Sequence, residues 1–147
     1  MHETSQIQLN SVIDRIARLL GLSAVDPEGS IVLTCLVAPC NITVGACYTL
    51  NRRVKLPAEL IVQVDRLGGP PARCLPPKLG AVVVRAATIF SLAAALFGSD
   101  EKAHAWWLHS MRLFPGVDMK PPAEWVAEAA SANELSRRMR LTEGGIF

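Results

Sequence analysis

The sequence has none of the short motifs that mark common catalytic sites. It contains no G-x-S-x-G nucleophile elbow, no phosphate-binding P-loop and no H-E-x-x-H zinc motif. His104 and His109 are five residues apart, a spacing that does not bring both side chains to one helical face as four would. Glu124, Glu128 and Glu134 fit a solvated helix face and helix caps better than an acid–base pair. We therefore predict a protein that is not an enzyme and that uses no cofactor or metal.

Cysteine is scarce and does not occur in a metal-binding pattern. The four cysteines, Cys35, Cys40, Cys47 and Cys74, all lie in the first half of the chain without a C-x-x-C pair. The first ten residues, MHETSQIQLN, are polar and lack the apolar core of a secretory signal. We expect free thiols packed as small hydrophobic side chains in a protein of the reducing cytoplasm.

The chain also carries little net charge. The formal charge of +2 is too small to predict a polyanionic partner by itself. Residues 1–78 hold eight Lys/Arg against six Asp/Glu, whereas residues 79–147 hold seven of each. The small basic surplus is therefore N-terminal.

The most prominent feature that is present is a long apolar run, LGAVVVRAATIFSLAAALF, at residues 79–97. Its apolar residues recur at i, i+3, i+4 and i+7, which predicts a helix, and that helix is apolar nearly all round. Such a helix is buried on every side or lies in lipid. A membrane span needs about 20 apolar residues, and Arg85 inside it would cost roughly 2.5–3.5 kcal/mol. We expect a buried helix, with a small single-span membrane protein as the alternative. The predicted stripe consists of Leu79, Val82, Val83, Ala86, Phe90, Ala93 and Phe97.

Upstream of this run the sequence favours helices, with one ambiguous stretch. The apolar spacing predicts a helix over about 11–20, followed by a turn at 26–29. Residues 31–53 fit either two short strands or two helices joined by a turn at 39–41. In the helical alternative, Asn41 caps the second helix and Arg52 and Arg53 close it. Local propensity does not decide between the two.

The next segment combines a short helix with the best linker candidate in the chain. Pro57 opens this helix and Gly68 ends it. Residues 68–78 contain two glycines and four prolines. We place a domain boundary there, between residues 1–78 and residues 79–147. The predicted buried face of the helix is Leu60, Ile61, Val64 and Leu67.

Three further helices are expected after the central run. Gly98 and Ser99 predict the end of one helix and the cap of the next, which covers about 100–110. Adjacent tryptophans cannot both face the core, so one of Trp106 and Trp107 is expected to stay partly exposed. A loop at 111–121 leads to a helix begun by two prolines, and a capping box at 131–134 predicts the last helix. The residues predicted to face inward on these helices are Ala103, one of the two tryptophans Trp106 and Trp107, Ser110, Trp125, Val126, Ala129, Leu135, Met139 and Thr142.

From Arg85 onward the order of features resembles the toxin-binding domain of Xre/MbcA/ParS-type antitoxins. That domain has a helix ending in a Phe-Gly turn, an acidic helix start and a Trp-Leu pair, which residues 96–103 and 107–108 match. A Gly-containing loop, a Pro-led helix and a Glu-Gly terminus with an aromatic residue follow, matched by residues 114–116, 121–126 and 143–147. The loop at 109–120 departs from the family because it lacks the usual Asn-Pro and Leu-Gly-Gly run. The resemblance covers residues 79–147.

This resemblance implies an antitoxin that binds a RES-domain toxin, an enzyme that destroys NAD, and blocks its active site with the C-terminal tail. Ile146 and Phe147 would fill an apolar pocket, and the terminal carboxylate would occupy an anion site. The alternative is that Phe147 folds back onto its own protein. The toxin contacts that we expect are Trp107, Arg137, Arg140, Glu143, Gly144, Gly145, Ile146 and Phe147.

The N-terminal half carries a second resemblance. Residues 49–53, followed by 56–59, are similar to the end of the recognition helix in the helix-turn-helix domain of these antitoxins. This similarity implies operator DNA as a partner and autoregulation of the operon, although Cys40, Gly45 and Cys47 depart from the motif, and a part serving dimerisation only is the alternative. We thus expect an all-α, cytoplasmic small helical bundle with a helix-turn-helix-like part at 1–78. It would form a homodimer within a toxin–antitoxin hetero-oligomer, with no membrane partner. The expected DNA contacts are Asn51, Arg52, Arg53 and Lys55.

Overall fold

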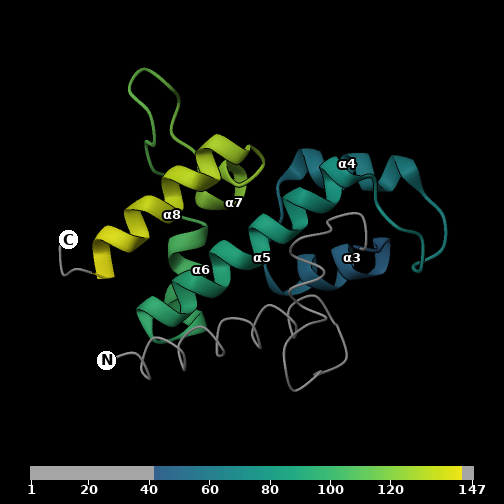
Figure 1. Ribbon diagram of the computed structural model, residues 1–147, viewed down its shortest axis with the longest axis horizontal. Helices are drawn as coiled ribbons and strands as arrows, with labels where there is room; N and C mark the ends of the chain where they lie inside the picture. The colour runs from purple at the N-terminus through teal and green to yellow at the C-terminus, as the bar shows by residue number, and fades with distance from the viewer. Residues whose placement is uncertain (1–41, 144–147) are drawn as a thin grey trace.

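The computed structural model describes residues 42–143, which form an all-α fold, as predicted (Figure 1). Within these residues only two isolated β-bridges occur, between Thr43 and Cys74 and between Met111 and Lys120. The predicted helix at 11–20, the turn at 26–29 and everything expected of residues 144–147 lie outside the described residues. The helices in chain order are α3 (Val44–Arg53), α4 (Ala58–Leu67), α5 (Pro77–Phe97), α6 (Asp100–Trp107), α7 (Pro122–Trp125) and α8 (Ala129–Glu143).

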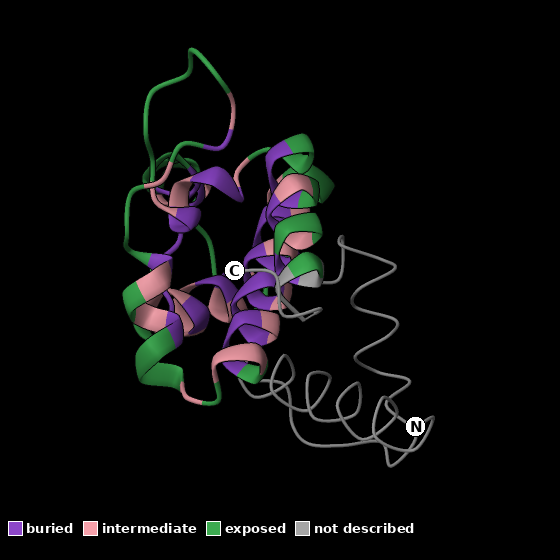
Figure 2. Ribbon diagram, turned by 90° about the vertical axis from the view of Figure 1, so that its left-hand side faces the viewer, coloured by how far each residue is buried: buried purple, intermediate pink, exposed green. Residues whose placement is uncertain are grey.

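Helix α5 runs through the middle of the fold and confirms the helix predicted for residues 79–97 (Figure 1). Because its side chains are apolar on nearly every face, it needs cover from several sides. Helices α3 and α4 pack against its first part, while α6 and α8 pack along the remainder. Eleven of its residues, from Gly80 to Ala94, are buried, and Figure 2 shows the buried residues on the helix sides that face one another. Gly98, in the left-handed conformation at φ 80°, ends the helix as expected.

Arg85, the one charge inside the apolar run, is bound by backbone carbonyl groups. Its Nε donates to the carbonyl oxygen of Val126 at 3.1 Å and its Nη2 to that of Ala127 at 2.9 Å. Partial burial lowers the pKa of the guanidinium. The two hydrogen bonds tie the middle of α5 to the segment between α7 and α8, so Arg85 has a packing role inside the fold.

Residues 42–53 adopt the helical alternative. Thr43 caps α3, since its Oγ1 accepts a hydrogen bond from the Ala46 amide at 3.1 Å. The cap is therefore not the predicted Asn41, which lies outside the described residues together with 31–40. Arg52 and Arg53 end the helix as predicted, where the helix dipole favours cations.

The proline-rich segment after α4 lies against the first turn of α3 and is not a free linker. The amides of Val44 and Gly45 donate to the carbonyl oxygens of Arg73 and Pro71 at 2.8 and 2.9 Å. The amide of Leu75, which is buried, donates to Ile42 at 2.8 Å. Proline lacks an amide proton but keeps its carbonyl, so a proline-rich segment can satisfy the unpaired amides at the start of a helix.

Helices α6 and α7 follow the predicted order, but the last helix begins at an earlier residue than predicted. Helix α6 is capped by Ser99 as expected but ends at Trp107, which leaves Ser110 exposed. The Pro-led helix is a single turn, α7, with Trp125 and Val126 buried as predicted. Ala129 is exposed and begins α8, and Ser131 lies inside that helix with its buried hydroxyl lacking a hydrogen-bond partner. The turn at 124–128 leads directly into α8 through backbone hydrogen bonds, so no side-chain capping box is needed. Leu135 and Met139 are buried as predicted.

The hydrophobic core crosses the predicted boundary at residue 78. One cluster of buried side chains contains Leu50, Leu60 and Leu75 from before the boundary and Phe90 and Leu135 from after it. The division into 1–78 and 79–147 stays a prediction, but the described residues on its two sides share a single core.

Candidate binding surfaces

The loop between α6 and α7, residues 108–121, projects from the helices and is held by several contacts (Figure 1). Met111 and Lys120 exchange both backbone hydrogen bonds, at 2.9 and 3.1 Å. Trp125 donates from Nε1 to the Met111 carbonyl at 3.1 Å, and the Lys120 ammonium lies 5.0 Å from the centroid of the Trp125 ring. Loops of this length without regular secondary structure are uncommon and often functional. This loop leaves Leu108, Val117 and Met119 exposed.

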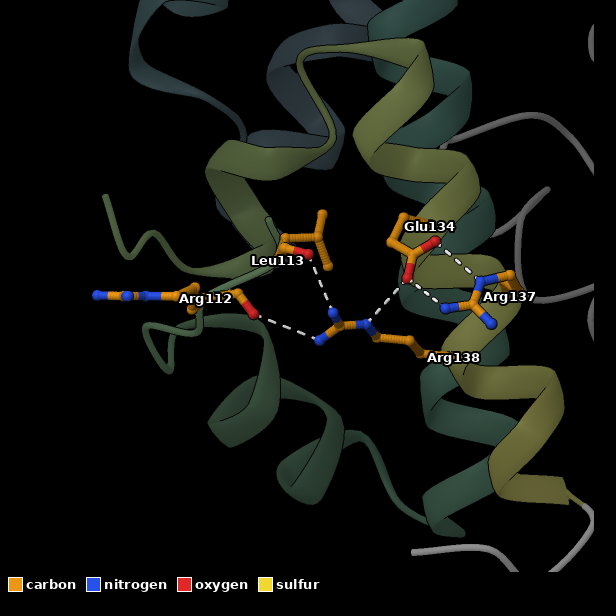
Figure 3. Close-up of polar contacts among 5 residues, drawn as sticks. All are labelled: Arg112, Leu113, Glu134, Arg137 and Arg138. Carbon is orange, nitrogen blue, oxygen red and sulfur yellow. Dashed lines mark hydrogen bonds and ion pairs between the residues drawn. The ribbon is translucent and has the colours of Figure 1, made fainter. Parts of the chain in front are cut away.

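Helix α8 holds the same loop through a network of two arginines and a glutamate (Figure 3). Arg138 donates from Nη2 to the carbonyl oxygen of Leu113 at 3.0 Å and from Nη1 to that of Arg112 at 3.3 Å. Glu134 accepts from Arg138 Nε at 3.2 Å and from two nitrogens of Arg137 at 2.6 and 2.9 Å. The Arg137 side chain is 60% exposed, so the network presents an oriented guanidinium at the surface.

We predict that Glu134 stays ionised far into the acid range. The hydrogen bonds from Arg137, and next those from Arg138, lower the pKa of Glu134 from 4.5 to about 2. Because the folded-state pKa is depressed, the stabilisation is present above the unfolded value and is lost as the pH falls through about 2. An NMR titration of the Glu134 carboxyl carbon should therefore have its midpoint near 2, and Arg137→Gln should raise that midpoint. A wild-type midpoint at 4.5 would show that the network does not form.

The residues expected to contact a toxin are only partly at the surface. Trp107 is 0% exposed, and its Nε1 donates to the Lys55 carbonyl at 2.7 Å. The prediction that Trp107 contacts a partner is therefore wrong in this fold, because its side chain belongs to the core. Trp106 is the partly exposed tryptophan, with its ring 5.9 Å from that of Phe97. Arg137 is exposed, so its predicted contact with a toxin stays a prediction. The side chains of Arg140 and Glu143 and all of residues 144–147 lie outside the described part of the chain.

The residues expected to bind DNA gather at the end of α3. Arg52, Arg53 and Lys55 are exposed. Asn51 differs, because its Oδ1 accepts a hydrogen bond from the Leu56 amide at 3.1 Å and so holds the turn before α4. Residues 42–78 carry six Lys/Arg against two Asp/Glu. The basic surplus of the described residues is therefore concentrated around α3 and α4.

An open groove of about 570 Å³ lies beside this basic end, between α3 and the turn at 69–72. Its lining includes Tyr48, Thr49 and Arg52 from α3 and Pro71 from the turn. The Tyr48 hydroxyl donates to the Asp65 carboxylate of α4, and this hydrogen bond raises the pKa of the Tyr48 phenol. No local sequence pattern indicates this groove, because its two sides, α3 and the turn at 69–72, are separated in the chain by the whole of α4.

Residues 42–143 contain two cysteines, Cys47 and Cys74. This part of the chain contains no group of three or more His, Cys, Asp or Glu that could hold a metal ion. Cys47 and Cys74 are free thiols, the first buried and the second exposed. Burial, with a smaller effect of Asp65, raises the pKa of Cys47 to about 11, so this thiol is not a nucleophile at neutral pH. Cys35 and Cys40 lie outside the described residues.

Residues 42–143 thus form a small all-α fold with two distinct surface features, the arginine–glutamate network of α8 with its loop and the groove beside α3. Comparison of the chain with known protein families, with characterised proteins and with solved structures finds no match. The resemblance to the antitoxins therefore rests on the order of residues in the chain itself.

Proposed function

We propose that the protein is the antitoxin of a type II toxin–antitoxin system, which neutralises a RES-domain, NAD-degrading toxin by blocking its active site with the C-terminal tail. The observation that supports this proposal is the order of elements from α5 onward. A long helix stopped at Gly98, an acidic helix capped by Ser99, a fixed loop, a Pro-led turn and a final helix follow one another. This is the order that the resemblance implies for the toxin-binding domain, and it needs no catalytic group.

In this proposal the end of α8 and the tail bind the toxin together. Arg137 is exposed and oriented by Glu134, and Arg140 and Glu143 follow it toward the end of the helix. Glycine populates backbone conformations that other residues avoid, so Gly144 and Gly145 permit the chain to turn away from α8. In the proposal, the apolar side chains of Ile146 and Phe147 then enter an apolar pocket of the toxin and block its active site.

Deleting residues 144–147 tests the proposal in cells. The deletion should abolish protection against the RES-type protein encoded in a neighbouring reading frame, while the far-ultraviolet circular dichroism of the purified chain stays unchanged. Replacing both Ile146 and Phe147 by serine should have the same effect, whereas Phe147→Leu, which keeps an apolar end, should still protect. Full protection by the deleted chain would contradict the tail mechanism.

A second role, binding operator DNA as a homodimer, is supported by the exposed cations at the end of α3. Changing Arg52 and Arg53 to alanine should weaken binding of an operator duplex and reduce its salt dependence by about one unit of log–log slope per lost phosphate contact. Fluorescence anisotropy at several salt concentrations measures both quantities. Lys102→Ala, an exposed cation on α6, is the matched control and should leave the slope unchanged. An unchanged slope in the double variant would remove these arginines from the DNA interface.

A single-span membrane protein is the alternative proposal, and one observation favours it. Helix α5 is 21 residues long and apolar enough to cross a bilayer. However, 61% of its most apolar window is buried inside the fold, and Arg85 is bound to carbonyl groups of the segment before α8. The core helix of a water-soluble protein has the same properties, so we place the antitoxin proposal first.

A further inference from the structure

We propose that the groove between α3 and the turn at 69–72 binds single-stranded nucleic acid, with the Tyr48 ring stacked on a base and Arg52 on a neighbouring phosphate. This inference does not depend on the toxin-binding proposal. It is an alternative to the operator-DNA role, because both use Arg52 and the covered start of α3 disfavours a duplex. The groove, of about 570 Å³, falls within the range of roughly 300–1,000 Å³ that is usual for ligand sites.

The charge around the groove is suited to a phosphate chain. Arg52 is the cation in the lining of the groove, and no acidic residue lies in that lining. The segment around it, residues 42–78, carries six exposed Lys/Arg against two Asp/Glu. Cations in excess over acids attract the phosphate backbone and make binding dependent on salt.

Tyr48 gives the groove an aromatic surface whose orientation is fixed before any ligand binds. Its side chain is partly buried against the hydrophobic core and also lines the groove. Its hydroxyl is bound to Asp65, which lies on a different helix, so the ring is held at both ends. A fixed aromatic ring beside an arginine is the combination on which proteins stack the bases of single strands.

The surroundings of α3 favour a single strand over a duplex. A recognition helix reads the major groove mainly with its N-terminal residues. Here that end of α3 is covered, because the amides of Val44 and Gly45 donate to the carbonyl oxygens of Arg73 and Pro71. The contact is close, since a Cβ added to Gly45 would lie 3.1 Å from Pro71. A duplex also hides the faces of its bases, whereas an unpaired strand offers them for stacking on an aromatic ring.

The test is fluorescence anisotropy of the full-length chain with a labelled oligothymidine of about 15 nucleotides and a duplex of the same length, at low salt. The single strand should bind more tightly than the duplex. Tyr48→Ala should weaken binding of the single strand by about tenfold, as expected for the loss of one stacked base, while Tyr48→Phe should keep most of it. Ala72→Glu, which places a carboxylate on the exposed side of the groove, should also weaken binding by about tenfold.

Ala130→Glu, at an exposed position of α8, adds the same charge away from the groove and should leave binding of the single strand unchanged. Ala72 is exposed, so its variant tests the groove even if Tyr48→Ala disturbs the fold. Three results would overturn the inference: no binding of the single strand at low salt, wild-type binding by Ala72→Glu, or tighter binding of the duplex than of the single strand.

Discussion

Replacing Trp107 by alanine is expected to lower the free energy of unfolding by about 3–5 kcal/mol, the usual cost of removing a large buried aromatic side chain. Trp107 is 0% exposed and packs edge-on against Phe90, with ring centroids 5.7 Å apart. Its Nε1 also donates to the Lys55 carbonyl at 2.7 Å, and this hydrogen bond joins α6 to the turn between α3 and α4. The variant therefore loses core volume and a link between the two halves of the chain.

Two variants separate these contributions in urea unfolding experiments. Trp107→Phe keeps an aromatic ring but leaves the Lys55 carbonyl without its donor. The unpaired carbonyl should lower the free energy of unfolding by about 1–3 kcal/mol, and the smaller ring should lower it further. Trp106→Ala is the matched control. Because the Trp106 side chain is partly exposed, this variant should lower the free energy of unfolding by less than about half as much as Trp107→Ala does. Equal losses for the two alanine variants would contradict the placement of the tryptophans.

A fragment of residues 79–147 is expected not to fold alone. It lacks Leu50, Leu56, Leu60, Val64 and Leu75, which are buried in the same cluster as α5. Each buried aliphatic side chain contributes about 1.5–3 kcal/mol, and a whole domain of this size is stable by only about 5–15 kcal/mol. Removing five of them from one core costs about 7.5–15 kcal/mol, which is as large as that margin.

The fragment should therefore lack a cooperative urea transition, while the full chain should show one. Circular dichroism at 222 nm measures urea unfolding of the fragment and of the full chain. Hydrogen-exchange protection of the Phe90 and Trp107 amides gives a second measure, since these residues should lose their protection in the fragment. A fragment with a cooperative transition and a protected Phe90 amide would show that the boundary at residue 78 separates two independent cores.

Much of the helical fold was predictable because its signals are local. The apolar spacing of 79–97 is a property of one stretch, and Gly98 with Ser99 shows both a stop and a cap within two residues. The same holds for Arg52 and Arg53 at the end of α3. Where one local signal competed with another, prediction failed. The pattern at 131–134 fits a capping box, but backbone hydrogen bonds of the turn at 124–128 begin α8 at Ala129.

The candidate sites were less predictable because their residues meet over long distances in the sequence. Periodicity shows that two adjacent tryptophans differ in burial, but only the Lys55 carbonyl, 52 residues away, decides that Trp107 is the inner one. Arg138 contacts backbone carbonyl groups of the loop that are 25 and 26 residues away in the sequence. Tyr48 and Asp65 meet between two helices in the same way.

The central structural claim is that α5 is the buried axis of a protein that folds in water. Hydrogen exchange of the full chain in buffer without detergent tests it most directly. We predict that the amides of α5 between Val82 and Ala94 exchange most slowly and only through global unfolding, because this stretch contacts both halves of the core. A chain that needs detergent to stay in solution, or α5 amides that exchange faster than those of α6, would contradict the account.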